Sequence, residues 1–597
     1  MKGNNMNNTA VEVFYAFDDN FAKYAVVSIA SMIRTSSPER QYSIHILHTG
    51  ITEEAMETIT DMQMDNFRIA FSDVSDYLAS IKEKLPIRDY YTRTTYYRLF
   101  IADMFPQYDK AIYIDADTVV RRDIAELYDT EIGEALVGAC HEQVMLQMDI
   151  YGEYVERVLG ISREVYFNAG LLLINSRAWR ERRVLEKFVR LLGEYDFVVT
   201  QDEDYINVIC KDRTYFLDRR WNTEVTEGIS HPYAVAEEAN IVHFIMANKP
   251  WHTENAVCAN IFWESAMGTP VYEKLRRELA EYTPEQLEAD KAGGVRLAEL
   301  ARSEIERKDN YLARLNEKRD PERVRVAALI EERERRGEFD LDVEDDPPTR
   351  QLLPDEIDYL RRSPIAKMKT YIAYRRAKKF LNYIKKQGLM VIKDIRGLEN
   401  LKNLDTGAVL CANHFNPFDT FAIHRAFLDA NLAPRKLYRV IREGNYTSFG
   451  GFYGYLMRHF YTLPLSSHPR TMQKMVRATD ELLCEGNLVL VYPEQSMWYN
   501  YRKPKPLKPG AYRFSVKNDL PVIPIFITMR DSDRIGADGY PIEEYTIHIS
   551  APLYPRAELS YKDAIEDLMT RNAEVWREIY ESEYGIPLTY TTENRSE

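Results

Sequence analysis

The chain has few cysteines, no long apolar run and no excess of basic residues. Its five cysteines among 597 residues are far apart and include no C-x-x-C pair, which indicates neither a zinc site nor a disulfide framework and fits a reducing cytosol. No run of about 18 apolar residues occurs, and the N-terminal segment lacks the apolar core of a signal peptide, so we expect no membrane-spanning segment. A formal net charge of −15 argues against a nucleic-acid partner for the whole molecule.

The chain contains enough apolar residues for more than one packed core. Hydrophobic residues make up 45% and aromatic residues 12% of the 597 positions, and this length favours two or three domains. From residue 11 to about residue 275, short β-rich runs alternate with helix-patterned segments. Strands resume later at AVLCAN, NLVLVYPE and LPVIPIFI, again separated by helical patterns. The pattern predicts two α/β domains with wound sheets.

The segment between these two regions has a different composition. Residues 283–336 are rich in Glu, Arg, Lys, Leu and Ala and begin at Thr283-Pro284, an N-cap followed by a first-turn proline, so we expect exposed linker helices. Residues 338–348, EFDLDVEDDPP, have two prolines and little to bury, which predicts a loop or a disordered stretch. We therefore expect three parts, at residues 1–280, 281–360 and 361–597, the middle one being a charged helical linker with an acidic loop.

Two carboxylates follow an apolar strand in the first domain. In KAIYIDADTVV, Asp115 and Asp117 stand where the strand ends, and carboxylates at this spacing can share one divalent cation. The segment VHFIMANKPWH supplies His243 as a possible third ligand and Lys249 as a cation for a phosphate. The alternatives are a solvated turn for the D-x-D triplet and a core position for His243. Taken together, the four residues suit a nucleotide diphosphate with its metal.

The motifs of residues 11–275 occur in the order typical of a known enzyme family. They are AFDDN, TTYYRL, IDAD, YFNAG, QDED and VHFIMANKPWH. With them the region resembles glycosyltransferase family 8, the retaining galactosyl- and glucosyltransferases of lipopolysaccharide synthesis. The resemblance implies a GT-A fold, a UDP-hexose donor and a bound Mn2+ or Mg2+ ion.

The same resemblance implies a role for each matching residue. The implied metal ligands are Asp115, Asp117 and His243. The implied contacts to uridine are Ala16, Asp18 and Asn20. The implied contacts to the rest of the donor are Arg98, which would steady it, Lys249 at the diphosphate, and Asn168 and Asp202 at the sugar.

Two residues depart from the family pattern. Glu203 stands where the family has the glutamine of D-Q-D, so it is either a carboxylate nucleophile below the anomeric carbon or a surface charge that the site tolerates. Met246 replaces a glycine that would let backbone approach the phosphates, which puts the local pose of the diphosphate in question.

A histidine and an aspartate follow a strand in the second domain. In CANHFNPFD, His414 precedes Asp419 by five positions, and a loop here can hold the imidazole against the carboxylate. A neutral histidine accepts a hydroxyl proton when a carboxylate fixes its tautomer. The alternative is a structural histidine beside a turn aspartate.

Later motifs support the catalytic interpretation of this pair. The segments NHFNPFD, LVLVYPEQS and GAYRFSVKNDLPVIPIFI resemble, in order and spacing, the lysophosphatidate (1-acylglycerol-3-phosphate) acyltransferase family over about residues 365–555. The resemblance implies that His414 activates an acceptor hydroxyl, that Asp419 orients it, and that Glu494 belongs to the acceptor-binding motif. It also implies acyl-CoA or an acyl carrier protein as the donor, and a lipid or glycolipid acceptor.

Both arginines that this family uses for an acceptor phosphate are absent. The usual F-P-E-G-T-R reads YPEQSM at residues 492–497, and the earlier motif ends in YTLPLSS. Either the acceptor has no phosphate group, or other basic residues of the domain bind that phosphate. The candidates are Arg502, Lys503, Lys505 and Lys508.

A basic helix is expected at the start of the second domain. Ser363 is a suitable N-cap, Pro364 a first-turn residue and Gly388 a C-terminal residue. Ten lysines or arginines and no acidic residue lie between Arg361 and Lys386, while apolar residues recur at three- and four-residue spacing. The segment is either a membrane-surface helix or a helix packed on the domain with solvated lysines.

These motifs together predict a bifunctional enzyme, cytoplasmic and peripheral on the inner face of the membrane. It would transfer a hexosyl group from a UDP-sugar with retention, and an acyl group from an acyl thioester to a lipid or glycolipid hydroxyl. A first alternative keeps the glycosyltransferase but makes the second domain a noncatalytic lipid-binding tether, which the intact His414 and Asp419 argue against. A second alternative, a scaffold of two decayed domains, conflicts with the retained metal-ligand set.

Overall fold

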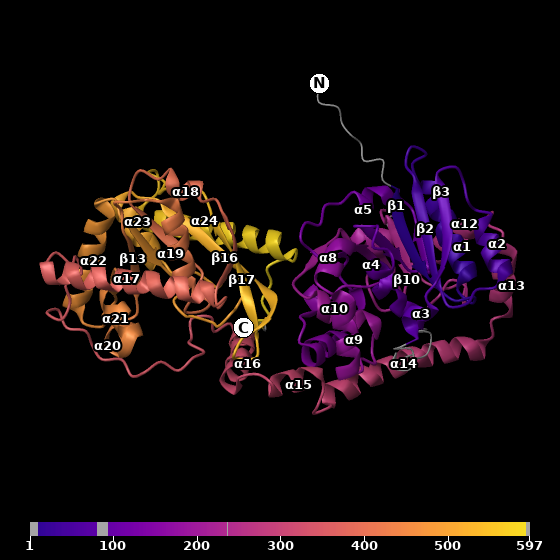
Figure 1. The fold of residues 1–597 in the computed structure, drawn as a ribbon, viewed down its shortest axis with the longest axis horizontal. Helices are drawn as coiled ribbons and strands as arrows, with labels where there is room; N and C mark the ends of the chain where they lie inside the picture. The colour runs from indigo at the N-terminus through magenta and orange to yellow at the C-terminus, as the bar shows by residue number, and fades with distance from the viewer. Residues whose placement is uncertain (1–9, 80–92, 236, 593–597) are drawn as a thin grey trace, which may run out of the picture. The chain divides into compact units, whose positions relative to one another are not determined.

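The computed structural model describes residues 10–79, 93–235 and 237–592, which fold into two compact units (Figure 1). The first unit extends to Leu315 and the second begins at Asn316. Each unit contains one seven-stranded sheet with helices around it. Within the described part of the chain, none of the helices is both long and apolar enough to span a bilayer.

The large sheet of the first unit has the strand order β3-β2-β1-β4-β7-β6-β8. The strands are β3 Phe67–Asp73, β2 Tyr42–His48, β1 Val11–Ala16, β4 Ala111–Ile114, β7 Leu171–Ile174, β6 Val137–Ala139 and β8 Thr214–Phe216. β7 runs antiparallel to β4 and to β6, and the other neighbours are parallel. β1, β4 and β7 are buried along their whole length, which explains why they read as apolar runs.

A small second sheet brings distant residues to the end of β4. Its order is β5-β10-β9, with β5 Thr118–Val120, β10 Ile241–Phe244 and β9 Thr223–Val225. β10 is antiparallel to β5, and the register pairs His243 with Thr118. His243 is thereby placed beside the short segment that joins β4 to β5, which contains both aspartates of the D-x-D triplet.

Helices cover the two sheets of the first unit. The α-helices are α1 Ala22–Thr35, α2 Glu53–Thr60, α3 Ser75–Leu78, α4 Ile101–Met104, α5 Ile124–Tyr128, α6 Gln143–Gln147, α7 Asp149–Tyr154, α8 Ser176–Glu181, α9 Val184–Glu194, α10 Asp202–Cys210, α11 Pro232–Val235, α12 Ala259–Ala266, α13 Tyr272–Glu281 and α14 Pro284–Glu306. The short helical turns are η2 Arg93–Phe100, η3 Val155–Leu159, η4 Arg163–Val165 and η5 Arg219–Asn222. The next helix, α15 Tyr311–Glu317, contains the point where the two units divide.

The sheet of the second unit has the order β11-β17-β16-β12-β15-β13-β14. The strands are β11 Val391–Arg396, β17 Pro541–Ile549, β16 Val522–Ile535, β12 Ala408–Ala412, β15 Leu488–Val491, β13 Leu437–Ile441 and β14 Thr462–Pro464. Only the pair β16 and β17 is antiparallel. β12 is fully buried between β16 and β15, so the loops that follow β12 and β15 meet at the same edge.

The helices of the second unit include the predicted basic helix. They are α16 Pro321–Arg336, α17 Pro364–Lys386, α18 Glu399–Lys402, α19 Asp419–Ala430, α20 Glu443–Thr447, α21 Gly451–His459, α22 Pro469–Cys484, α23 Gly510–Asn518 and α24 Tyr561–Tyr584. α17 begins as predicted, because the Ser363 side chain accepts the backbone N–H of Ala366 at 3.1 Å and Pro364 occupies the first turn. Gly388, just after its C-cap, has φ +64°.

The helical middle region of the chain is not exposed in the way we expected. Leu297 and Ala301 of α14 are buried in a core cluster of the first unit. Val326 and Ile330 of α16 are buried with Trp498 in the second unit. The expectation of exposed linker helices is therefore wrong for these faces, because apolar residues in a charged helix still pack on the nearest core. The boundaries at residues 280 and 360 stay a prediction.

Candidate active sites

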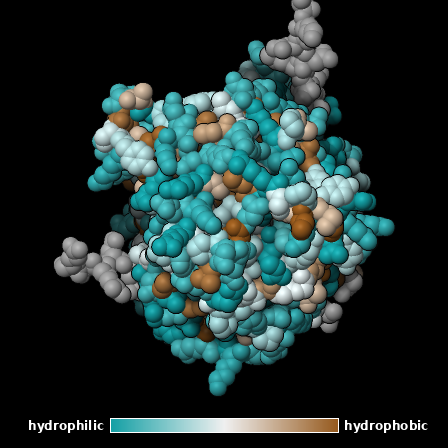
Figure 2. All heavy atoms as spheres, turned by 90° about the vertical axis from the view of Figure 1, so that its left-hand side faces the viewer, coloured by the Kyte–Doolittle hydropathy of each residue, from teal (hydrophilic) through white to brown (hydrophobic). Residues whose placement is uncertain are grey.

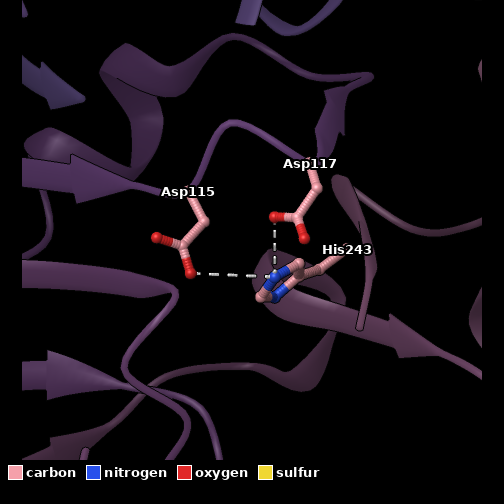
Figure 3. A group of neighbouring side chains, drawn as sticks. All are labelled: Asp115, Asp117 and His243. Carbon is pink, nitrogen blue, oxygen red and sulfur yellow. Dashed lines mark ion pairs between the residues drawn. The ribbon is translucent and has the colours of Figure 1, made fainter. Parts of the chain in front are cut away.

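The metal-ligand candidates of the first unit lie together at the end of β4. Asp115 and Asp117 come from the segment between β4 and β5, and the His243 side chain points toward them from β10 (Figure 3). Nε2 of His243 lies 3.2 Å from Oδ1 of Asp117 and 3.9 Å from Oδ2 of Asp115. One ligand atom of each residue lies within 4.8 Å of the other two. Two carboxylates and one imidazole are donors that suit a divalent metal ion.

Polar residues behind the cluster orient its imidazole. Nδ1 of His243 lies 3.1 Å from Oδ1 of Asn222, which leaves Nε2 directed at the carboxylates. The Asn222 amide donates to Oδ1 of Asn168 at 2.9 Å, and the same oxygen accepts the backbone N–H of Gly170 at 2.9 Å. A ligand imidazole is commonly fixed through its second nitrogen. Asn168, predicted to handle the sugar, thus also supports the metal-ligand set.

Arg98 is buried directly beneath the cluster. It lies on η2, is 3% exposed, and donates to Oδ1 of Asp115 at 3.0 Å. Its Nε lies 3.2 Å from Oδ2 of Asp202. Burial opposes the guanidinium charge, but Asp115 and neighbouring acidic groups outweigh it and raise the pKa of Arg98. Burial also raises the pKa of Asp202 to about 6, against the pull of Arg98, so Asp202 is mainly ionised at neutral pH.

Lys249 forms an ion pair with the other aspartate. Its Nζ lies 2.7 Å from Oδ2 of Asp117 and also donates to the carbonyl oxygen of Phe244. Burial favours the neutral carboxyl, but the charges of Lys249 and His243 outweigh it and hold the pKa of Asp117 below its usual value. Asp117 is therefore a carboxylate at neutral pH, as a metal ligand must be.

A cleft that opens to solvent surrounds the cluster. Its lining contains the metal-ligand candidates and six of the predicted donor-site residues, namely Ala16, Arg98, Asn168, Asp202, Glu203 and Lys249. Asp18 and Asn20 stand outside this lining. Oδ1 of Asp18 accepts the backbone N–H of Asn20 at 3.0 Å and that of Phe21 at 3.2 Å, so Asp18 shapes the turn that leads into α1.

Glu203 belongs to a group of three glutamates at the cleft. Its Oε2 accepts the backbone N–H of Ala169 at 2.8 Å, while Glu142 and Glu224 accept backbone N–H groups at 2.5 and 3.0 Å. Burial raises the pKa of all three carboxyls, and the charge of Glu142 raises the pKa of Glu203 and of Glu224 further. The interpretation of Glu203 as a surface charge is therefore wrong, because the residue lines the cleft and its carboxyl lies under the influence of the Glu142 charge.

Met246 has a backbone conformation that favours glycine. Its φ is +57°, in the left-handed region, and its side chain lines the cleft. A left-handed conformation at a residue with a Cβ costs about 1 kcal/mol relative to glycine. Met246 therefore presents a side chain to the cleft from a conformation that glycine would adopt at lower cost.

The predicted dyad of the second unit is formed. Nδ1 of His414 lies 2.6 Å from Oδ2 of Asp419, which also accepts the backbone N–H of Phe415 at 3.3 Å. The hydroxyl of Tyr492 donates to Oδ1 of Asp419 at 2.8 Å, and its ring stacks on His414 with centroids 4.1 Å apart. Asp419 is fully buried while the His414 side chain is 25% exposed. Nε2 of His414 is therefore the ring nitrogen that can receive a proton from an acceptor.

Glu494 supports the histidine loop through backbone contacts. It is 2% exposed, and its Oε2 accepts the backbone N–H of His414 at 2.9 Å. Its Oε1 accepts the backbone N–H of Lys505 at 2.8 Å. Burial raises the pKa of Glu494, although Lys505 and these N–H groups pull it down. Both carboxyl oxygens are thus engaged in positioning the loop on which His414 lies.

The cations expected to bind an acceptor phosphate are all engaged within the protein. Nζ of Lys505 donates to the carbonyl and to Oγ of Ser496, both at 2.7 Å. The other three form ion pairs, Arg502 with Asp531 and Glu543, Lys503 with Glu334, and Lys508 with Asp340.

Sequence reasoning missed several residues of these sites. Asn222, Glu142 and Glu224 lie far along the chain from the motifs that they support, and single buried polar residues leave no spacing signal. Tyr492 is the first residue of the YPEQSM motif, and this position in the motif was the only sign in the sequence that it belongs to the site. Gly170 belongs to the YFNAG motif, but its packing against the cluster depends on the tertiary structure.

Gly170→Ala is expected to weaken metal binding by at least tenfold without unfolding the protein. A Cβ at this position would lie 2.2 Å from Cε1 of His243 and 2.8 Å from Oδ2 of Asp115, so both ligands must shift. The measurement is Mn2+ titration of the full-length protein. Gly193→Ala is the control, because a Cβ there meets nothing within 4 Å. Equal Mn2+ affinity of Gly170→Ala and wild type would show that the cluster is not the metal site.

Glu203→Gln is expected to raise the free energy of unfolding at neutral pH. The folded pKa of Glu203 is raised, so its contribution to stability is complete below the unfolded pKa of about 4.3 and is lost as pH rises through the folded pKa. The amide keeps the acceptor for the Ala169 N–H and removes the charge. Chemical denaturation between about pH 4 and pH 8 measures this slope.

The exposed Glu264→Gln of α12 serves as its control and should leave the pH slope unchanged. A Glu203→Gln protein that is less stable than wild type at neutral pH would show that the ionised carboxylate is stabilised in the fold.

Two family models match the chain. Residues 12–255 match glycosyl transferase family 8, and residues 393–528 match the acyltransferase family. The predicted α/β fold class, with a GT-A-like first domain, a helical middle region and an acyltransferase-like second domain, is confirmed.

Individual proteins resemble one or the other part. A lipopolysaccharide 1,3-galactosyltransferase of Salmonella typhimurium is 27% identical over 260 residues, which cover 41% of this chain and 74% of that protein. General stress protein A of Bacillus subtilis is 26% identical over 253 residues, covering 40% of this chain and 85% of that protein. The solved structure of a 1-acyl-sn-glycerophosphate acyltransferase, PlsC, from Thermotoga maritima is 19% identical, with a TM-score of 0.27, and covers 37% of this chain and 83% of that one. The chain thus joins a domain of glycosyl transferase family 8 to a domain of the acyltransferase family.

Proposed function

We propose that the protein is bifunctional, with a retaining hexosyltransferase in the first unit and an O-acyltransferase in the second. The observation that carries the proposal is that each unit has its own complete set of reacting groups. The first unit has a metal-ligand cluster flanked by Arg98 and Lys249. The second unit has a histidine, His414, paired with the buried carboxylate of Asp419. The relative named as a lipopolysaccharide 1,3-galactosyltransferase supports transfer of a hexose, for which we propose a UDP-sugar as donor.

In the first unit, the residues around the cleft suit the departure of UDP. Asp115, Asp117 and His243 would hold Mn2+ or Mg2+, which when bound neutralises the diphosphate that leaves. Lys249 supplies a further positive charge near Asp117. The uridine would lie at the end of β1, where Ala16 lines the cleft and where Asp18 and Asn20 form the turn that follows the strand.

Two carboxylates are candidates for a nucleophile that would give retention by double displacement. Asp202 is paired with Arg98 at 3.2 Å and has a pKa of about 6, so it is available as an anion at neutral pH. Burial and the charge of Glu142 raise the pKa of Glu203, which favours its protonated form. We assign attack on the anomeric carbon to Asp202, which would break the bond to the UDP oxygen and then be displaced by the acceptor hydroxyl, whose proton the departing diphosphate can take. We assign hydrogen bonding to the sugar to Glu203 and Asn168.

In the second unit, the dyad suits activation of a hydroxyl. Nε2 of His414 would take the proton of an acceptor hydroxyl as its oxygen attacks the thioester carbonyl carbon. The carbon–sulfur bond then breaks, and the leaving thiolate, from acyl-CoA or an acyl carrier protein, recovers that proton. Asp419 holds Nδ1 and stabilises the imidazolium that forms. The short dyad bond and the support of its loop by Glu494 favour catalysis over the tether alternative.

The surface of α17 supports attachment to a membrane. One face is packed on the domain through Ala373, Ala377, Leu381 and Ile384, so part of the packed-helix alternative holds. The rest is basic and also presents large apolar residues, namely Ile365, Met368, Tyr371, Ile372 and Tyr383. Figure 2 shows a largely hydrophilic face with separate hydrophobic side chains. Such a mixture suits the headgroup region of an anionic membrane, and we place the protein on the inner face.

The two activities are expected to be lost independently. Asp117→Ala should abolish UDP release from UDP-glucose or UDP-galactose and leave acyl transfer unchanged. His414→Ala should lower acyl transfer by about two to four orders of magnitude and leave UDP release unchanged. UDP release and transfer of a radiolabelled acyl group to a panel of lysolipids and glycolipids are measured in the same samples.

Undiminished UDP release by Asp117→Ala, or in excess chelator, contradicts the metal assignment. Full acyl transfer by His414→Ala contradicts the assigned base. A wild type that releases UDP but acylates no acceptor makes the tether the better description.

Liposome binding is expected to rise with anionic lipid and to fall with salt. The double variant Ile365→Ser/Met368→Ser should bind more weakly, because these side chains, 64% and 57% exposed, would enter the lipid. Ile535→Ser is the control, since Ile535 is 63% exposed on β16. Sedimentation with vesicles measures the binding of the wild type, of the double variant and of the control. Binding that is insensitive to salt, or equal weakening by the control, would show that α17 is only a packed helix.

A further inference from the structure

The acidic segment, residues 338–348, is pinned beside the acyl-transfer site. The ring of Phe339 stacks on Trp498 with centroids 5.6 Å apart, and the Trp498 indole N–H donates to the carbonyl of Leu341 at 2.9 Å. Oγ of Ser496 donates to the carbonyl of Phe339 at 2.7 Å. Val343 is buried in the same cluster. The segment forms neither helix nor strand, so the predicted loop is confirmed, and its few apolar residues pack against the buried ring of Trp498.

Carboxylates of the acidic segment engage two cations of the second unit. Arg442 donates to both oxygens of Asp342, at 2.7 and 2.8 Å, and to Asp346 at 3.5 Å. Nζ of Lys508 lies 3.2 Å from Oδ2 of Asp340. These side chains are partly exposed, so each pair on its own stabilises the fold only slightly. Their importance lies in the position of the negative charges.

The same two cations contact the loop that supports the catalytic histidine. Arg442 donates to the carbonyl of Gln495 at 2.8 Å, and the backbone N–H of Lys508 donates to the carbonyl of Pro493 at 2.9 Å. Glu494 lies between Pro493 and Gln495 in the sequence, and its side chain accepts the backbone N–H of His414. The acidic segment and the dyad are therefore on either side of one short loop.

A third cation at this loop is also under the influence of the acidic segment. Lys505 is 3% exposed and is held by Ser496. Burial lowers the pKa of Lys505 to about 8, while the charges of Glu494 and Asp342 oppose this shift. An incoming phosphate would thus meet Lys505, Arg442 and Lys508 already compensated by carboxylates of the chain.

We propose that the acidic segment restricts the acyl-transfer site to acceptors with an uncharged head group, such as a monoacylglycerol or a neutral glycolipid. The inference rests on the proposed acyltransferase function and names its acceptor class. A phosphate at the loop would lose the cations to Asp340 and Asp342 and would be repelled by these carboxylates. Like charge at a fixed position discriminates against a ligand even when each ion pair is weak. Because the backbone of the segment is pinned at Trp498, the carboxylates stay in place.

The test compares two double variants of the full chain that remove the same charge from the same segment. Asp340→Asn/Asp342→Asn frees Lys508 and Arg442. Glu344→Gln/Asp345→Asn is the control, because those residues pair with Arg323 and Arg325 instead. Acyl transfer is measured to lysophosphatidate and to a monoacylglycerol of the same chain length, which differ only in the phosphate.

Wild type and control should acylate the monoacylglycerol at least tenfold faster than lysophosphatidate. Asp340→Asn/Asp342→Asn should raise the lysophosphatidate rate at least tenfold, with the monoacylglycerol rate unchanged. A wild type that prefers lysophosphatidate, or a ratio that shifts equally in both variants, overturns the proposal.

Binding of glycerol 3-phosphate, measured by calorimetry, separates this inference from the proposed function. We expect binding by Asp340→Asn/Asp342→Asn, and none by wild type or control. This result supports the inference even if no acceptor is acylated, in which case the acyltransferase assignment alone fails. Binding of glycerol 3-phosphate by wild type overturns the inference whatever the acyl-transfer result.

Discussion

Compensation of charge at the end of a buried central strand is the constraint on which both sites depend. β4 and β12 are fully buried, and each leads into acidic or ionisable residues that cannot remain buried without partners. In the first unit, Arg98 and Lys249 compensate the two aspartates of the metal-ligand cluster. In the second unit, the imidazole of His414 is the partner of the fully buried Asp419 carboxylate. The partners that make these charges tolerable are the groups on which the proposed chemistry depends.

Each site contains a non-glycine residue in a left-handed backbone conformation. Met246 has φ +57° beside the metal cluster, and Gln495 has φ +67° in the loop beneath the dyad. Each left-handed residue costs about 1 kcal/mol relative to glycine. Tertiary contacts maintain the conformation, and at Gln495 the contact is the Arg442 guanidinium on its carbonyl oxygen. Left-handed residues with a Cβ persist only where the surrounding structure holds them, which is common at functional sites.

The middle of the chain contributes to the sites rather than merely joining them. Leu297 of α14 lines the cleft of the first unit as well as belonging to its core. The acidic segment that follows α16 lies against the loop of Glu494 in the second unit. The middle of the chain thus contributes an apolar side chain to the lining of the first proposed active site and negative charge to the surroundings of the second.

Local spacing was sufficient to predict the parts of each site that lie on one short segment. Asp115 and Asp117 follow one strand, and His414 and Asp419 are separated by one turn, so the sequence itself indicated their proximity. Contacts between distant segments required the tertiary structure. The β10–β5 register brings His243 to the aspartates, and Asn222 orients it without any motif of its own. The acidic segment had the composition of a solvated loop, and only the fold placed Asp342 on Arg442, 100 residues away, because ion pairing depends on distance in space and not on separation along the chain.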